Sequence, residues 1–243
     1  MSHLELHRAV AAREIGATLA AHTTMLADAG VPVVIAGDVP AERRDRLAAA
    51  VAAASPLPVG TGSAEIKISA DEPFTWLADP TGVGCLVAGA GAAPRSPRTT
   101  RLVALGLAEH LDPATTRTVI RSLVRGFPLV ATAPGRSLAE MLDRLRGGEL
   151  RLPEDDLHRL GAVVVLDRAP EGSIRVASAH LMRPPTLDGG ARRPPMLLAT
   201  SNADGTWDDY AWAALPELAE RVGFTQGEYS QRLRERERLL AAP

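Results

Sequence analysis

The sequence is poor in cysteine and aromatic residues and has almost no net charge, and each of these features excludes a class of protein. One of its 243 residues is a cysteine, Cys85, so no disulfide framework can form within the chain and a reducing compartment is expected. Aromatic residues make up 3%, too few for the stacking platforms that bind single-stranded nucleic acid. The net charge of −2 supplies no overall basic field for nucleic acid or an anionic membrane.

Long apolar runs are also missing. No stretch of about 18 uninterrupted apolar residues occurs, so we expect no membrane span. The opening segment MSHLELHRAV carries charges and does not read as a signal peptide. We therefore expect a cytoplasmic protein that neither binds nucleic acid nor inserts into a membrane. A hydrophobic content of 46% and a charged content of 23% are typical of a globular chain that can bury a core.

Apolar runs alternate with segments of helical pattern. The predicted helices cover residues 4–29, 40–54, 112–125, 137–145 and 157–160, with a short one at 71–79. The predicted buried strands cover residues 33–36, 102–105, 129–132 and 163–166, with further strands at 65–68 and 85–88 and a loop at 89–99. Such alternation predicts an α/β fold with a mainly parallel sheet and crossover helices.

The pattern changes near residue 180. Residues 169–172 read as a turn into a strand at 174–177, which together predict a hairpin. Prolines and arginines follow, and a charged helix is predicted at 226–240. We therefore divide the chain into an α/β domain with an N-terminal helix, residues 1–180, and a C-terminal extension packed on the sheet, residues 181–243.

The strand at 33–36, the turn at Gly37 and the helix after it form a strand–loop–helix unit. In α/β folds such a unit can hold phosphate at the helix N-terminus, where a working loop reads G-x-x-x-x-G-K-[ST]. The residues at that spacing are Gly37, Asp38, Val39, Pro40, Ala41, Glu42, Arg43 and Arg44.

This loop departs from the working pattern at its chemical positions. Glu42 replaces the second glycine, and Arg43 replaces the lysine with a guanidinium that is not interchangeable with an ammonium. Arg44 replaces the hydroxyl that holds Mg²⁺, and the one lysine of the chain is Lys67. We expect a shortened turn with the helix starting near Pro40 and both arginines solvated or paired with acids. In the simplest interpretation, the glycine only turns the chain between strand and helix.

Three segments resemble the RecA-like ATPase domain of the type II and type IV secretion and type IV pilus motor family. They are VPVVIAGDVPAERRDRLAAAV (31–51), RLVALGLAEHLDPATTRTVIRSLVRGFPLVATAPGRSLAEMLDRL (101–145) and LHRLGAVVVLDRAPEGSIRVASAHLM (157–182). The resemblance implies a RecA-like P-loop layout. It also implies hexameric assembly, ATP and Mg²⁺ as cofactors, and work in pilus assembly or secretion.

The departures from that family concentrate in its active elements. Leu107 stands at the family's Walker B glutamate, the carboxylate that serves water and metal. Pro134 stands at its histidine and Arg136 at its asparagine. The resemblance, with these losses, implies a pseudo-ATPase that scaffolds or regulates a partner, either a secretion or pilus ATPase or further copies of itself. On this interpretation no catalytic residue and no cofactor is expected.

Other chemistry-bearing residues offer weaker candidates. Glu109, His110 and Asp112 follow a predicted strand and could serve acid–base chemistry, although the favoured interpretation is an exposed turn in which Asp112 caps a helix. Cys85, His158 and His180 form no pattern with metal-ligand spacing, so no metal is expected. Ser137 is expected to cap a helix in a capping box with Glu140.

Two alternatives to the pseudo-ATPase therefore stay open. One is a weak ATP hydrolase that uses Arg43 in place of the lysine, which requires an open loop with this side chain pointing inward. The other is an unrelated α/β enzyme with Glu109, His110 and Asp112 as its acid–base groups, which requires a pocket elsewhere than at the loop.

Overall fold

The computed structural model describes residues 2–55, 63–77, 95–184, 192–202 and 204–242. Its strands are β1 (Val33–Gly37), β2 (Ala64–Lys67), β3 (Thr100–Ala104), β4 (Leu129–Ala133), β5 (Ala162–Arg168), β6 (Ile174–Leu181), β7 (Met196–Ser201) and β8 (Trp207–Asp209). Its helices are α1 (Ser2–Ala11), α2 (Ala17–Asp28), α3 (Ala41–Ala54), α4 (Pro113–Ser122), α5 (Leu138–Arg146), α6 (Glu154–Leu157), α7 (Ala211–Val222) and α8 (Gln226–Ala241), with a 3₁₀ turn η1 (Leu123–Arg125).

The strands form one sheet in the order β2-β3-β4-β1-β5-β6-β7-β8. The first five are parallel to their neighbours, with β1 between β4 and β5. The remaining three pair antiparallel, so the sheet is mixed and mostly parallel. The α/β class and the four predicted central strands are confirmed, because β1, β3 and β4 are buried throughout and β5 over its first five residues. Their apolar runs suit strands covered on both faces.

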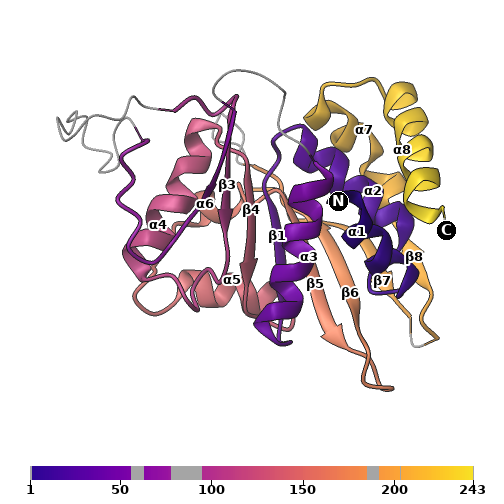
Figure 1. The fold of residues 1–243 in the computed structure, drawn as a ribbon, viewed down its shortest axis with the longest axis horizontal. Coiled ribbons are helices and arrows are strands. Elements are labelled where there is room, and N and C mark those ends of the chain that lie inside the picture. Colours follow the sequence, from indigo (N-terminus) through magenta and orange to yellow (C-terminus); the bar gives the residue numbers. More distant parts are fainter. Residues whose placement is uncertain (1, 56–62, 78–94, 185–191, 203, 243) are drawn as a thin grey trace.

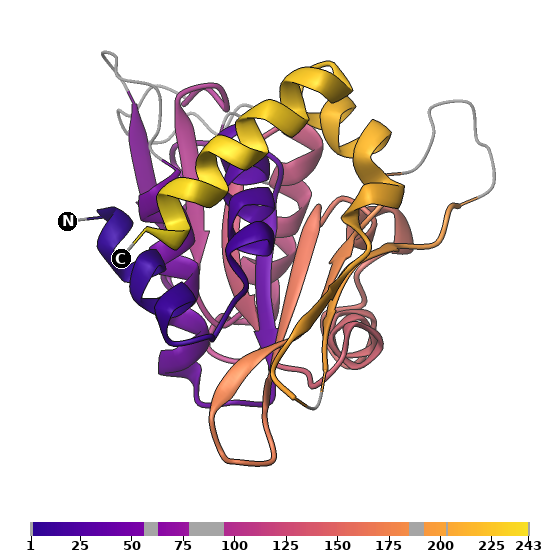
Figure 2. The same cartoon turned by 90° about the vertical axis from the view of Figure 1, so that its right-hand side faces the viewer.

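Helices cover both faces of the sheet (Figures 1 and 2). One core packs α1, α2, α3, α7 and α8 against residues such as Val33 and Ile35 of β1. The other packs α4, α5 and α6 against the opposite face, where Val34 and Ala36 of β1 point. Alternate residues of one buried strand thus serve two cores. No helix in the described part of the chain is long and apolar enough to cross a membrane.

Several sequence expectations are corrected. The predicted helix at 4–29 is two helices, because Arg13 takes a positive φ of 57° and Gly16, in an extended conformation, is the N-cap of α2. The described residues 71–77 form turns rather than a helix. The helix predicted at 157–160 instead spans Glu154–Leu157. The strand predicted at 85–88, with Cys85, and residues 89–94 lie outside the described residues.

The segment after residue 181, which was expected only to pack on the sheet, also contributes strands to it. β7 pairs with β6 and β8 pairs with β7, so two strands from this segment widen the sheet. The charged helix predicted at 226–240 is confirmed as α8, which begins with a capping box between Thr225 and Glu228. Its charged residues contact α2, since Arg236 bonds Asp28 and Glu237 accepts from the Thr18 hydroxyl.

Candidate functional site

The connection between β1 and α3 lies at the carboxyl ends of the parallel strands, at the lower edge of the sheet in Figure 1. Only residues 38–40 separate the two elements, and Pro40 stands at the N-cap of α3. The predicted shortened turn with a helix start near Pro40 is confirmed. The helix begins two residues before Arg43, so the chain that would wrap a phosphate is already helical.

Gly37 is required here by its neighbour strand. A Cβ on this residue would lie 2.6 Å from the main-chain oxygen of Leu166 in β5, at a φ of +156°. A contact that short is incompatible with a side chain. The glycine therefore lets β1 and β5 approach, which agrees with the simplest interpretation of the loop.

Arg44 fills the centre of the turn. Its side chain is 3% exposed, and one terminal nitrogen donates to the carbonyl oxygens of Gly37 at 2.8 Å and Val39 at 2.7 Å. The other terminal nitrogen pairs with the carboxylate of Glu109. The expectation that Arg44 pairs with an acid is confirmed, and its guanidinium is buried rather than solvated. The helical spacing of Arg44 to the buried Leu47, Ala48 and Val51 could have shown this.

The polarity of the turn is the reverse of a phosphate loop. A phosphate loop aims its amide N–H groups at a central anion. Here two carbonyl oxygens, Gly37 O and Val39 O, aim at a central cation that belongs to the chain itself. The turn is therefore complementary to positive charge, and that charge is already in place.

The neighbouring strand ends are joined through Thr132 at the end of β4. Its hydroxyl donates to Asp45 of α3 at 2.8 Å and accepts from the amide of Gly106 after β3 at 2.7 Å. Leu107, at the family's glutamate position, is fully buried in the core. Glu109, two residues further on, does bring a carboxylate to this end of the sheet, but it serves Arg44. Thr132 and Asp45 were not anticipated from the sequence.

The other loop residues face outward. Asp38, Pro40, Glu42 and Arg43 are exposed. Arg43 extends away from the turn to Glu14, at 2.9 Å, and its side chain is 45% exposed. The inward-pointing Arg43 that a weak ATPase requires is thus not observed.

Glu109, His110 and Asp112 line one open groove of about 870 Å³, but each is engaged differently. Asp112 caps α4 by accepting from the amides of Ala114 and Thr115, at 2.8 and 3.0 Å. Hydrogen bonds from Thr115 lower the pKa of this carboxyl. The imidazole of His110 packs against Gly106, where an added Cβ would lie 2.6 Å from its Cδ2. Glu109 thus forms an ion pair, His110 makes a packing contact and Asp112 caps a helix, so the three side chains have separate structural roles.

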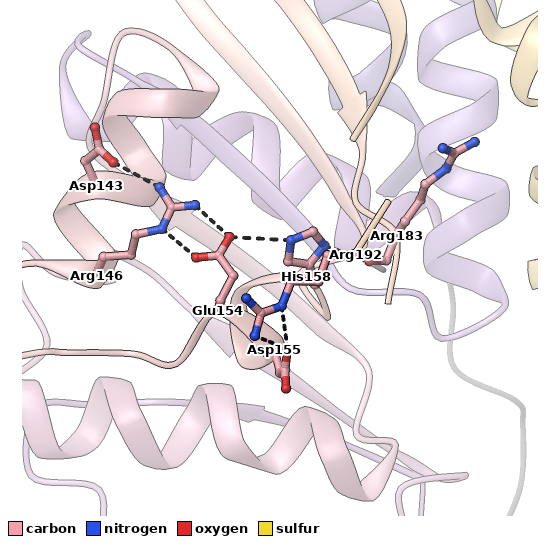
Figure 3. A network of polar contacts seen from close by, with 7 residues as sticks. All are labelled: Asp143, Arg146, Glu154, Asp155, His158, Arg183 and Arg192. Carbon is pink, nitrogen blue, oxygen red and sulfur yellow. Dashed lines mark hydrogen bonds and ion pairs between the residues drawn. The ribbon is translucent and has the colours of Figure 1, made fainter. Parts of the chain in front are cut away.

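His158 belongs to a polar network at the opposite end of the sheet (Figure 3). Arg146 of α5 contacts both carboxylate oxygens of Glu154 at 2.7 Å and Asp143 at 2.9 Å. The bond from Arg146 lowers the pKa of Glu154, and His158 lies 3.4 Å from the same carboxylate. The Nδ1 atom of His158 meets the Arg183 carbonyl at 2.8 Å. These contacts join α5, α6 and the segment that follows β6, so the role of His158 is structural.

The remaining candidates have structural partners. Ser137 caps α5 as predicted, but the capping box is not formed, because Glu140 accepts from the amide of Arg136 instead. His180 pairs with Ser178, and burial lowers its pKa. Within the described ranges, no group of three or more His, Cys, Asp or Glu side chains is arranged to hold a metal ion.

Comparison with known proteins does not identify a family or a function for this chain. No protein-family model matches the sequence, and no curated protein matches it.

Proposed function

We propose that this chain is a P-loop-like domain that does not hydrolyse nucleotide and acts as a scaffold or regulatory partner in an assembly of the secretion and pilus ATPase type. The burial of Arg44 carries this proposal. A triphosphate would need the space that its guanidinium fills, and would meet two carbonyl oxygens and the Glu109 carboxylate there. Displacing the arginine would leave these acceptors facing the phosphate oxygens.

Two further observations support the proposal. The loop strand β1 lies inside the parallel part of the sheet, between β4 and β5, and β3 lies on the far side of β4, so strands from the segments that resemble the motor family are neighbours in the sheet. In addition, Leu107 is buried among apolar side chains. A scaffold can keep this framework while its catalytic positions are occupied by core and pairing residues.

The partner of such a domain is a protein, either a secretion or pilus ATPase or a further copy of the chain. Trp212, at the start of α7, has a relative exposure of 73%. An indole so exposed is unusual, and aromatic residues are enriched at protein interfaces. It offers a reporter for assembly, because its emission would change if a partner covered it.

Calorimetric titration with ATP and ADP, each with and without Mg²⁺, tests the central claim. We expect no saturable heat at millimolar nucleotide and no phosphate release above background. The alternative of a weak ATPase predicts Mg²⁺-dependent binding that Arg43→Ala abolishes, and this result would overturn the proposal. Arg192→Ala, which removes an arginine paired with Asp155 of α6 at the opposite end of the sheet, with a side chain 55% exposed, is the matched control.

A further inference from the structure

A second cavity lies on the other side of the molecule from the α5 and α6 helices. It occupies about 460 Å³ between the junction of α1 and α2 and the strands β7 and β8, which lie together at the right of Figure 1. Its size falls in the range of small-molecule sites. The apolar part of its wall includes Val10, Ile15, Leu19, Leu198 and Trp207.

The N-terminus of α2 opens into this cavity. Gly16 stands at the N-cap in an extended conformation and supplies no side-chain cap. Residues 16–19 line the cavity. In the described part of the chain, the amides of Ala17, Thr18 and Leu19 have no hydrogen-bond acceptor, since the first bond of the helix is from Ala20 to Gly16. Uncapped amides at a helix N-terminus favour an anion.

His22 adds a buried donor one turn further along α2. Its relative exposure is 3%, and its Nδ1 lies 2.7 Å from the hydroxyl of Tyr229, which is fully buried. Among the described residues that hydroxyl has no other hydrogen-bond partner, so its proton can form a hydrogen bond only if it is donated to Nδ1 of His22. The proton of a neutral His22 must then be on Nε2.

The Nε2 atom meets open space rather than packed atoms. It has no hydrogen-bond partner among the described residues, yet it keeps accessible surface, unlike the buried polar atoms left without partners. The ring lines the cavity, and Tyr229 does not. His22 therefore presents an unpartnered N–H to the same space as the helix amides.

The charges around the cavity narrow the choice of ligand. Arg13 lines it, and no acid in the described ranges forms an ion pair with its side chain. Asp209 also lines it, with one carboxylate oxygen accepting from the Ala211 amide at 2.8 Å. A second acid, Glu237, accepts from the Thr18 hydroxyl at 2.6 Å. These two carboxylates would repel a doubly charged phosphate. They favour a ligand that carries one negative charge and a hydrogen-bond donor next to it.

We infer that this cavity binds a small carboxylic acid with an apolar body and an amino or hydroxyl group beside its carboxylate. The acid group lies at the α2 amides, within reach of Arg13 and the N–H of His22. The neighbouring donor faces Asp209, and the apolar body packs against Trp207 and the aliphatic wall. The inference is independent of the proposed function, because none of the β1–α3 turn residues lines this cavity.

Trp207 can report binding directly. A variant with Trp76→Phe and Trp212→Phe leaves Trp207 as the one tryptophan of the chain. Its fluorescence would be titrated with leucine, phenylalanine, 3-phenyllactate, hexanoate and phenyl phosphate. We expect saturable changes with the amino and hydroxy acids at a Kd below about 1 mM, and weaker binding of hexanoate and phenyl phosphate.

Two substitutions at Gly16 separate ligand binding from folding. Gly16→Asp places a carboxylate at the N-cap, where it can accept from the α2 amides itself. It should maintain or raise Tm while weakening binding at least about tenfold. Gly16→Ala makes the same Cβ contact with Trp207, 3.4 Å from its Cε3, without the carboxylate, and should retain binding. Arg13→Asn should weaken binding by a similar factor, because it removes the guanidinium at a position whose positive φ asparagine tolerates.

The inference fails if none of the carboxylic acids gives a saturable change, or if Gly16→Asp binds as tightly as Gly16→Ala. Preference for phenyl phosphate over every carboxylate would overturn the ligand class. The nucleotide titrations of the proposed function use a different site and readout, so the two proposals can fail separately.

Discussion

Both α2 and α3 begin without a side-chain cap, but the space in front of α3 is filled and the space in front of α2 is open. In front of α3, Arg44 lies buried among the carbonyls of Gly37 and Val39. In front of α2, three amides line a cavity. A helix N-terminus therefore becomes an anion site only where the facing space is empty and its other groups are donors. The positions of Gly37 and Arg44 in a motif cannot decide this.

The largest expected effect on stability comes from removing the Arg44 side chain that fills the space in front of α3. Arg44→Ala removes a buried guanidinium and leaves two carbonyls and Glu109 without their donor, so we expect the free energy of unfolding to fall by about 3–5 kcal/mol. Arg44→Lys should recover part of the loss by retaining the charge. Urea denaturation measures both. A loss below about 1 kcal/mol for the alanine variant would show that the guanidinium does not hold the turn.

The second prediction concerns the open terminus and pH. Burial is the main cause that lowers the pKa of His22 from 6.5 to about 4, against the opposing fields of Asp209 and Glu237. Between these values the unfolded chain takes up a proton that the folded chain refuses. Stability should therefore fall by about 3 kcal/mol as the pH drops from 6.5 to 4.

His22→Gln isolates this term from the carboxylates that also titrate on acidification. The variant should lack the His22 part of the pH dependence, and His110→Gln, at an exposed position, should keep it. The measurement is the free energy of unfolding in urea at several pH values. Parallel curves for wild type and His22→Gln would contradict the assignment.

Gly37→Ala tests why a glycine stands at the end of β1. The clash with the Leu166 oxygen should cost about 2–3 kcal/mol. Gly148→Ala is the matched control, because that glycine has a φ of +56° and nothing within 4 Å of an added Cβ. It should cost about 1 kcal/mol from backbone strain alone. If the two variants lose the same free energy of unfolding, the close contact between Gly37 and β5 does not contribute to stability.

The smallest effect is expected at Arg43. Its pair with Glu14 is exposed, with a guanidinium 45% accessible, and such pairs contribute about 0–1 kcal/mol. Arg43→Ala should shift the unfolding curve by no more than this. A larger change, or a change in nucleotide binding, would mean that the side chain turns inward in solution.

The sequence was sufficient for the central sheet and insufficient for both helix termini. The β1, β3, β4 and β5 runs are apolar throughout, and that pattern has one physical solution, a strand covered on both faces. The burial of Arg44 cannot be inferred from its charge, and only its helical position, three residues before the buried Leu47, indicates it. The cavity at α2 depends on Trp207, which lies against Gly16, and on Tyr229, which bonds His22; both residues approach α2 only in the folded chain.

The contacts between α2 and α8 have a consequence for how the chain folds during synthesis. His22 meets Tyr229, Asp28 meets Arg236 and Thr18 meets Glu237 across separations of 207, 208 and 219 residues. An emerging α2 must therefore wait for almost the whole chain before its buried polar groups find their partners. We expect ribosome-bound chains that lack α8 to expose the face of α2 to proteases and chaperones, and protection to appear in one late step once α8 has left the exit tunnel.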